Sequence, residues 1–503
     1  MKNFLSKIVL TLLLLPFTLA AKQPNIVFIL SDDAGFEEFG VYKVKKGIAS
    51  NTPNIDALAE RGVVFKQAWT QAICGPSRSM VLSGNYAVHN GAYDNKIYYL
   101  KNPEDYKRKD RLPSFTKVLK DAGYAVAVAG KWHNPAGFDI LTNSKDLGVD
   151  SYTVWNADPK PFEEILGKKL VPDSTWEASA ITGAPKISRY WKPGIIENGK
   201  VLTTTMKDYG PDIFSDAIVD FIDEQAKAKK PFLAYYTMVL PHGAHTPTPD
   251  DVAKGAVASN KTVPKGTEQG AKNFLSQMNY ADKLVGKIVN KIEQLGITED
   301  TYIVYASDNG TTSSAKGKAV EYGVHVPFVV AGADVKQRGM TDELMDFTDV
   351  LPTFAELADT KIPGHFNVDG QSMAAFLKGK SDSTKDVIYS FPGPGSLVRT
   401  KDYLLEAVAP IYGQPEGRLY KTNGSYDGRG YENITHNIEY ANIKKKMLAH
   451  LVAMENPLPT SFDDPIWVNS KKMIKGKKFF DNKKRAKKHL ELPKDYKFYD
   501  ESF

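Results

Sequence analysis

The sequence of 503 residues contains a single cysteine, Cys74. One cysteine excludes an intramolecular disulfide. A lone cysteine is either a small buried hydrophobic residue or one kept for its chemistry, and its sequence neighbours have to decide between the two.

Long apolar runs are absent after residue 21. Residues 8–19 are almost uninterruptedly apolar, follow Lys2 and Lys7, and end near two alanines. The positive start, the length of the apolar run and the small residues at its end are typical of a cleaved signal peptide, whereas an uncleaved membrane anchor would need a longer apolar run. We therefore predict a signal peptide at residues 1–21, no stable membrane insertion, and export to the periplasm or the cell exterior.

The sequence also lacks low-complexity tracts and a strong excess of one charge: 25% of its residues are charged and the formal net charge is +6. Lysines crowd residues 471–488. Such a run is usually a solvated tail, and the alternative is attraction to a polyanion. No recognition motif accompanies it, so nucleic acid is not expected as a partner.

Strand and helix patterns alternate along most of the chain. Short apolar runs predict strands at residues 25–30, 63–65, 124–129, 232–237, 302–306 and 326–330. Helical spacing predicts helices from about residue 53 and at residues 112–122, 213–226, 271–295 and 348–358. This alternation predicts an α/β fold with a large mixed, mostly parallel sheet sandwiched by helices.

The pattern changes near residue 378 to short strands at 387–389 and 397–405 and a helix at 443–451. We predict a catalytic domain at residues 22–377 and a smaller C-terminal α+β subdomain with a basic tail at residues 378–503. Polar groups follow the ends of several strands of the larger domain. Because ligands collect at the carboxyl ends of strands in α/β sheets, these segments are expected to meet at one site.

The motif with the most specific chemistry is CGPSR at residues 74–78, followed by Leu82 and Gly84. A thiolate phosphatase would place an arginine six residues after its cysteine, where this chain has Met80. The motif instead resembles the signature of formylglycine-dependent (type I) sulfatases of the alkaline-phosphatase-like superfamily. In that family a maturation enzyme, the formylglycine-generating enzyme, oxidises the cysteine to formylglycine (3-oxoalanine) during export.

Two pairs of residues with side-chain oxygen donors follow predicted strands: Asp32 with Asp33, and Asp308 with Asn309. Neighbouring carboxylates repel, so a buried pair needs a cation or a raised pKa. Oxygen donors without histidine or cysteine suit a hard ion such as Ca²⁺, and a relative with two zinc ions would have histidine after Asp308. The first pair alone could equally cap a turn. The resemblance implies that all four residues are calcium ligands.

Further segments occur in the order found in sulfatases: GKWH at residues 130–133, Pro-His at 241–242, and Lys316 ahead of Val-Pro at 326–327. The resemblance thus implies a catalytic set of Cys74, Arg78, Lys131, His133, His242 and Lys316, of which Lys131, His242 and Lys316 also contact substrate. Outside these motifs, His245 is either a further substrate contact or a surface histidine. Lys318 is an alternative to Lys316. The chain departs from the family pattern at Asn134-Pro135, after the first histidine, and at His325.

The resemblance implies hydrolysis of sulfate esters. We expect a sulfated carbohydrate as substrate, with an algal galactan such as carrageenan favoured. The alternatives are glycosaminoglycans, small aryl or alkyl sulfates, a phosphate or phosphonate ester, and a polyanion-binding protein without activity. The intact proton-transfer residues His133 and His242 argue against the last.

Overall fold

The computed structural model describes residues 23–44, 50–92, 95, 112–135, 138–157, 159–168, 187–261, 263–264, 266–310, 315–392, 395–410 and 414–455. The predicted signal peptide at residues 1–21 and the lysine-rich stretch at 471–488 lie outside these ranges, so both stay predictions. Within the ranges, no helix combines the length and the apolar character that crossing a bilayer requires.

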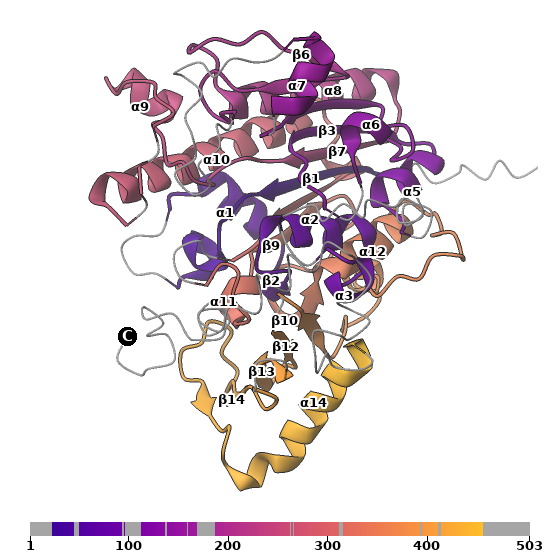
Figure 1. Cartoon of the computed structure of the whole chain (residues 1–503). Helices are drawn as coiled ribbons and strands as arrows, with labels where there is room; N and C mark the ends of the chain where they lie inside the picture. Colours follow the sequence, from indigo (N-terminus) through magenta and orange to yellow (C-terminus); the bar gives the residue numbers. More distant parts are fainter. Residues whose placement is uncertain are drawn as a thin grey trace, which may run out of the picture.

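A ten-stranded sheet organises the larger part of the described chain (Figure 1). Its strand order is β10-β2-β9-β8-β1-β7-β3-β4-β5-β6. The pairs from β8 through β1, β7 and β3 to β4 are all parallel, whereas β9 and β5 run against their neighbours. The predicted large, mostly parallel sheet is confirmed. The strands are β1 (Asn25–Ser31), β2 (Gly62–Trp69), β3 (Ala125–Lys131), β4 (Ser151–Trp155), β5 (Ile195–Glu197), β6 (Lys200–Val201), β7 (Phe232–Thr237), β8 (Thr301–Ser307), β9 (Phe328–Gly332) and β10 (Gly339–Asp346).

Helices cover both faces of this sheet. One face carries α1 (Pro53–Glu60), α8 (Gly210–Ala228) and α10 (Glu268–Gln294), and the other carries α2 (Cys74–Ser83), α5 (Phe115–Asp121) and α12 (Val350–Leu357). Shorter helices lie in the connections: α3 (Ala87–Asn90), α6 (Ile140–Asn143), α7 (Pro159–Leu166), α9 (Pro249–Ala253), α11 (Glu321–Val324) and α13 (Ala374–Leu377).

The packing of strand β1 explains why its residues 26–30 are all apolar. Side chains alternate across a strand, so Phe28 faces one helical layer and Ile29 the other. The Phe28 ring packs edge-on against Phe115 of α5 and Phe354 of α12, with centroids 6.1 and 5.7 Å apart. A strand covered on both faces favours apolar side chains, and the polar residues of β1, Asn25 and Ser31, stand only at its two ends.

The large sheet differs from the expectations in the direction of β9 and in four strands that were not predicted, β4, β5, β6 and β10. The strand predicted at 326–330 forms as β9 and is antiparallel to β8 and β2. Strand β10 was not predicted, because its sequence GMTDELMD is polar and its first half is exposed at the edge of the sheet. Pairing with β2, rather than an apolar pattern, makes it a strand.

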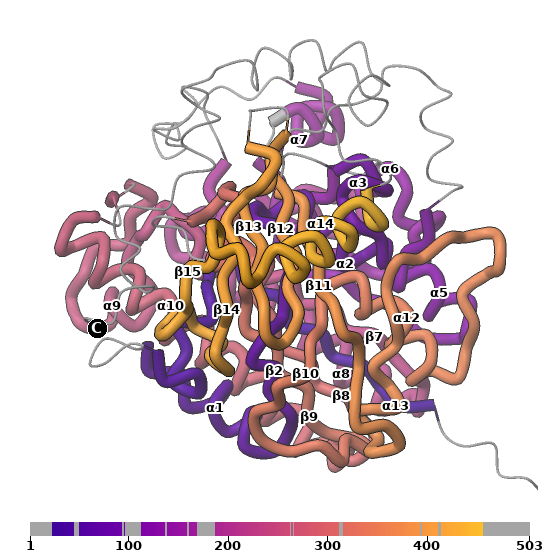
Figure 2. Tube along the Cα trace, turned by 90° about the horizontal axis from the view of Figure 1, so that it is seen from below, coloured from indigo at the N-terminus to yellow at the C-terminus, as the bar shows by residue number. Residues whose placement is uncertain are grey.

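A second, antiparallel sheet follows in the C-terminal part. It consists of β11 (Ile388–Ser390), β12 (Ser396–Arg399), β13 (Tyr403–Val408), β14 (Arg418–Lys421) and β15 (Glu432–Asn433). Figure 2 shows α14 (Ala441–Glu455) lying across the strands of this sheet. This arrangement confirms a smaller α+β subdomain, while its boundary at residue 378 stays a prediction.

The smaller sheet is tied to the larger part through α11. Glu321, the first residue of α11, is fully buried and its Oε1 lies 2.6 Å from Nη1 of Arg399 in β12. The Tyr431 hydroxyl donates to Oε2 of the same carboxylate at 2.8 Å, and the Glu321 backbone N–H donates to Glu406 of β13 at 3.0 Å. The connection before α11 therefore rests on the second sheet.

Gly130 in β3 allows close contact with β7. Its φ is +109°, and a Cβ there would lie 1.9 Å from the Thr237 carbonyl oxygen. We expect Gly130→Ala to lower the free energy of unfolding by about 3 kcal/mol, since left-handed strain and overpacking add. Chemical denaturation measures this.

Gly255→Ala is the matched control, because Gly255 has φ +100° and a Cβ there would have no atom within 4 Å. Gly255→Ala should lower the free energy of unfolding only by the backbone strain that it introduces, about 1 kcal/mol. Equal losses in the two variants would contradict the role of the β3–β7 contact.

Candidate active site

Four adjacent parallel strands bring the predicted site residues together. Strands β8, β1, β7 and β3 end at the same edge of the sheet. Asp32 and Asp33 follow β1, Asp308 follows β8, Lys131 ends β3, and His242 follows β7. Residues more than 270 positions apart in the chain thereby become neighbours.

Three carboxylates form the centre of this edge. Asp32, Asp33 and Asp308 are all buried. The Asp33 backbone N–H donates to Oδ1 of Asp308 at 3.1 Å, and Nδ2 of Asn309 donates to Oδ1 of Asp33 at 2.9 Å. Asp33 adopts φ +69°, a strained backbone conformation of the kind that clusters at functional sites. We call Asp32, Asp33, Asp308 and Asn309 the acid cluster.

Cationic side chains surround the acid cluster. Lys131 Nζ donates to both carboxylate oxygens of Asp32, at 2.8 and 2.7 Å. Arg78 donates from Nε to Oδ2 of Asp308 at 2.9 Å, and its Nη2 lies 2.8 Å from the same oxygen. Lys316 pairs with Oδ1 of Asp33 and lies 3.5 Å from Sγ of Cys74.

The cations keep two of the three acids ionised. Burial by itself would raise the pKa of Asp32, but Lys131 and other cationic neighbours hold it well below its usual range. The pKa of Asp33 is likewise lowered, by His242 and Lys316 against burial. Burial and the charge of Asp32 raise the pKa of Asp308 to about 7. Burial is the larger of these two causes, and repulsion from the neighbouring carboxylate adds to it.

Cys74 is the first residue of α2, and all ten residues of this helix are buried. Gly84, with φ +68°, caps its C-terminal end. The thiol points at the acid cluster, with Sγ 3.7 Å from Oδ1 of Asp33. The positive end of a helix stabilises negative charge, so an anion held at Cys74 benefits from it. Burial nevertheless raises the pKa of the unmodified thiol to about 12.

The two predicted histidines flank the centre. Nε2 of His242 lies 3.3 Å from Oδ2 of Asp33, and its Nδ1 lies 2.5 Å from the Gly243 carbonyl oxygen. His133 has φ +40°, and its Nε2 lies 3.1 Å from the Asn95 carbonyl oxygen. Burial lowers the pKa of both histidines, to about 3 for His133, whose ring is therefore neutral at pH 7. For His242 the neighbouring carboxylate of Asp33 opposes the effect of burial.

Two further residues at the site had no signal in the sequence. Asn95 contacts His133 and also accepts the Gly75 backbone N–H through Oδ1 at 2.8 Å. Arg189 places Nη1 3.3 Å from Oδ2 of Asp32. Neither belongs to a recognisable motif, because each reaches the site from a connection whose path only the fold determines.

The secondary candidates lie as follows. His245 is buried, with Nδ1 3.0 Å from Oε1 of Gln277 and its ring edge-on to Phe274. Its assignment to substrate stays a prediction. Of the two candidate lysines, the structure places Lys316 against Asp33 and Cys74.

The acid cluster has the character of a site for a hard cation. Side-chain ligand atoms of Asp32, Asp33, Cys74 and His242 lie within 4.8 Å of one another, and Asp308 adjoins them through Asp33. Buried Oδ1 of Asn309 accepts no hydrogen bond from the described residues. An unpaired buried carbonyl oxygen beside three carboxylates fits Ca²⁺, which prefers oxygen ligands.

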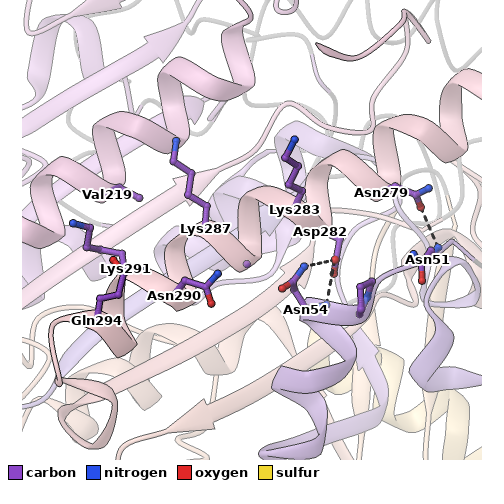
Figure 3. Close-up of a pocket in the computed structure, with 12 residues that line it drawn as sticks. Asn51, Asn54, Val219, Asn279, Asp282, Lys283, Lys287, Asn290, Lys291 and Gln294 are labelled. Atoms are coloured by element: carbon purple, nitrogen blue, oxygen red, sulfur yellow. Dashed lines mark hydrogen bonds between the residues drawn. The ribbon is translucent and has the colours of Figure 1, made fainter. Parts of the chain in front are cut away.

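A separate groove of about 660 Å³ is lined by residues of α10, α8 and the start of α1 (Figure 3). Three lysines of α10 line it: Lys283, Lys287 and Lys291. Each is paired with a carboxylate, namely Asp250, Asp216 and Asp223. Because carboxylates pair with these three lysines, the groove is a poor candidate for binding an anion. None of its lining residues belongs to the acid cluster.

Comparisons with known proteins agree with these features. The Sulfatase family model matches residues 24–360. A protein named sulfatase from Formosa agariphila is 28% identical, covering 94% of this chain and 93% of its own. An ulvan-active sulfatase from the same organism is 28% identical over 77% of this chain and 63% of its own. The crystal structure of Ps i-CgsB, also solved with k-i-k-neocarrahexaose, superimposes with a TM-score of 0.68 at 22% identity, covering 93% of this chain and all of its own.

The unmodified Cys74 thiol should be unreactive. With its pKa raised to about 12, roughly one thiol in ten thousand is ionised at pH 8. We expect no labelling by iodoacetamide in the native, unconverted protein in the presence of a chelator, and full labelling in urea, as read by intact-mass spectrometry.

Ser383→Cys provides the control, because Ser383 is exposed. The introduced thiol should be labelled within minutes in the native protein. Rapid native labelling of Cys74 itself would contradict the burial of this thiol.

Proposed function

This chain belongs to the sulfatase family and is a sulfuric ester hydrolase, and we propose that it removes sulfate from a sulfated polysaccharide with a formylglycine made from Cys74 and a calcium ion at the acid cluster. The observation that carries the proposal is the meeting of Cys74, Asp33 and Lys316 at one buried point, with Sγ 3.7 Å from Asp33 Oδ1 and 3.5 Å from Lys316 Nζ.

Conversion of Cys74 to formylglycine is supported by the CGPSR motif and by the thiol itself. A neutral, buried thiol is a weak nucleophile, so the unmodified residue would contribute little. Formylglycine supplies, as a hydrated aldehyde, a hydroxyl that can attack sulfur and a second hydroxyl that allows sulfate to be expelled afterwards. The maturation enzyme that makes it would be a necessary partner.

Calcium would be held by Asp32, Asp33, Asp308 and Asn309. The unpaired Oδ1 of Asn309 supports this assignment, because a cation can take the place of the hydrogen-bond donor that this buried oxygen lacks. A bound Ca²⁺ supplies neutralisation of the charge on the sulfate oxygens and on the nucleophile.

We assign the binding of sulfate and the proton transfers to side chains around the acid cluster. Lys131 is assigned to hold sulfate oxygens, and Arg78 is assigned to polarise the attacking hydroxyl and to stabilise the charge that builds up there. His242, with Lys316, is assigned to deliver a proton to the departing alcohol oxygen. His133 is assigned to accept the proton from the second hydroxyl, and its lowered pKa keeps the ring ready as a base.

A polysaccharide substrate outside the cytoplasm is supported by the predicted signal peptide and by what relatives are named for. One is named for ulvan, and one neighbour in fold was solved with a neocarrahexaose. We favour an algal galactan such as carrageenan, acted on in the periplasm or outside the cell. The residues 22–377 would form the catalytic domain and 378–503 the subdomain that supports it.

Sulfate release tests the reaction and the substrate together. The protein is co-expressed with a formylglycine-generating enzyme, supplied with calcium, and incubated with carrageenans, ulvan, fucoidan and glycosaminoglycans. We expect free sulfate, measured by ion chromatography, from one class of polysaccharide. Cys74→Ser should release at least about 1,000-fold less, because a serine would retain the transferred sulfate as a stable ester.

Ser79→Ala is the matched control, since Ser79 lies in the same helix outside the proposed catalytic set. Full multiple turnover by Cys74→Ser would refute the proposed nucleophile. Release of phosphate from matched esters, with no release of sulfate, would assign the site to phosphoester hydrolysis.

Calcium binding has a readout that does not depend on activity. Saturating Ca²⁺ should raise the melting temperature of the chelator-treated protein by several degrees, since a ligand at 100 times its Kd stabilises by about 2.7 kcal/mol. The shift should be strongly reduced in Asn309→Ala and kept in Asn290→Ala, which alters an exposed asparagine of α10. An equal shift in both variants would place the ion elsewhere.

A further inference from the structure

Arg189 is a cation at the acid cluster that none of the proposed catalytic steps uses. Its Nη1 lies 3.3 Å from Oδ2 of Asp32, and its guanidinium lies 4.1 Å from the ring centroid of Trp155 at the end of β4. The side chain is 14% exposed, so it is largely buried yet reachable from solvent. Stacking on an aromatic ring fixes the plane in which its N–H groups point.

The backbone around Arg189 is held in place on its C-terminal side. The hydroxyl of Tyr190 donates to the Val239 carbonyl oxygen at 3.1 Å, and Nε1 of Trp191 donates to that of Pro247 at 2.9 Å. Both acceptors belong to the segment after β7 that also carries His242. Arg189 is therefore positioned before any ligand arrives, which lowers the entropic cost of binding to it.

Asp32 does not require Arg189 as a partner. Lys131 contacts both of its carboxylate oxygens at 2.8 and 2.7 Å, closer than Nη1 of Arg189. In the described part of the chain, Nε and Nη2 of Arg189 have no hydrogen-bond acceptor. A guanidinium that is mostly buried with donors unused fits a binding group that waits for an anion.

The charge at the site exceeds what one sulfate ester needs. Four cationic side chains face the centre: Arg78, Lys131, Lys316 and Arg189. Three carboxylates oppose them: Asp32, Asp33 and Asp308. A divalent ion at the acid cluster would enlarge the positive excess, whereas the ester to be cleaved carries a single negative charge. The excess favours a ligand with more than one anionic group.

We propose that Arg189, held against Trp155, binds a second anionic group of the substrate, a sulfate or a carboxylate, beside the ester that is cleaved. The inference rests on the proposed function and deepens it, because it names the substrate class as a sugar chain with closely spaced anionic groups. Arg189 then contributes to the choice of substrate, while the groups around Cys74 carry out the reaction.

Anomalous diffraction from selenate, a tetrahedral anion like sulfate, tests the subsite directly. Crystals of the calcium-loaded Cys74→Ser protein are soaked in sodium selenate. We expect one selenium peak between Lys131 and Lys316 and a second within hydrogen-bond distance of Arg189. Arg189→Met should lose the second peak and keep the first, and Arg189→Lys should retain the second at lower occupancy.

The possible results separate this inference from the proposed function. A peak at Arg189 without one at Lys131 supports the subsite and counts against the sulfatase centre. Selenate at the centre, or only on other surface residues, with none at Arg189 overturns the subsite. Thermal melting of Arg189→Met confirms that the variant is folded.

Kinetics with the polysaccharide that releases sulfate provide the second measurement. In Arg189→Met, kcat/KM should fall at least about ten-fold, mainly through KM, because a charged hydrogen bond is lost. The loss should be smaller on 4-methylumbelliferyl sulfate, which carries one anionic group, and partly restored in Arg189→Lys. Arg61→Met, which alters an exposed arginine paired with Glu293, should match the parent on both substrates. Equal losses on both substrates in Arg189→Met would overturn the inference.

Discussion

The repulsion among three buried carboxylates is the constraint on which the rest of the site depends. Asp32, Asp33 and Asp308 meet at the carboxyl edge of the sheet, where little water remains to screen them. Burying unpaired charge costs several kcal/mol per ion, so such a centre is stable only if positive groups are built around it. Lys131, Arg78 and Lys316 meet that requirement by pairing with the three carboxylates, and burial still raises the pKa of Asp308 to about 7. The calcium ion and the anionic substrate that we propose would both bind at this centre.

The second sheet shares in this arrangement, although its own strands contribute no residue to the acid cluster. Lys316 lies in the connection between β8 and α11, which is held at Gly317 by the Ala72 carbonyl oxygen, at 2.8 Å. Farther along, Glu321 is fixed by Arg399 of β12. Burial raises the pKa of the Glu321 carboxyl to about 7 in spite of that arginine. Removing either partner would leave the other polar group buried without its partner, which destabilises the fold. The C-terminal subdomain thereby supports the lysine that contacts Asp33.

Several parts of the fold follow from local sequence. The buried strands β1, β3, β7 and β8 were predictable because each is a short apolar run that a strand between two helical layers requires. The long helix α10 was predictable because its apolar residues recur at helical spacing. Strand β10 was not, since a polar edge strand has no such pattern and forms only because β2 offers it hydrogen bonds. The antiparallel direction of β9 was equally hidden, because strand direction depends on the path of the connections.

For the site, the chemistry of the individual groups could be read from the sequence: one cysteine in a CGPSR motif, Asp32-Asp33 and Asp308-Asn309 after two strands, and histidines and lysines in a recognisable order. These are local properties, readable because the residues of each motif are adjacent in the chain. Which of these groups are in contact depends on the fold of the whole chain. It brought Lys316 to Cys74, left Oδ1 of Asn309 without a partner, and added Asn95 and Arg189, which belong to no motif. The physical reason is that contacts between distant segments depend on strand order and on the burial that follows from it, and neither is encoded in any short stretch of residues.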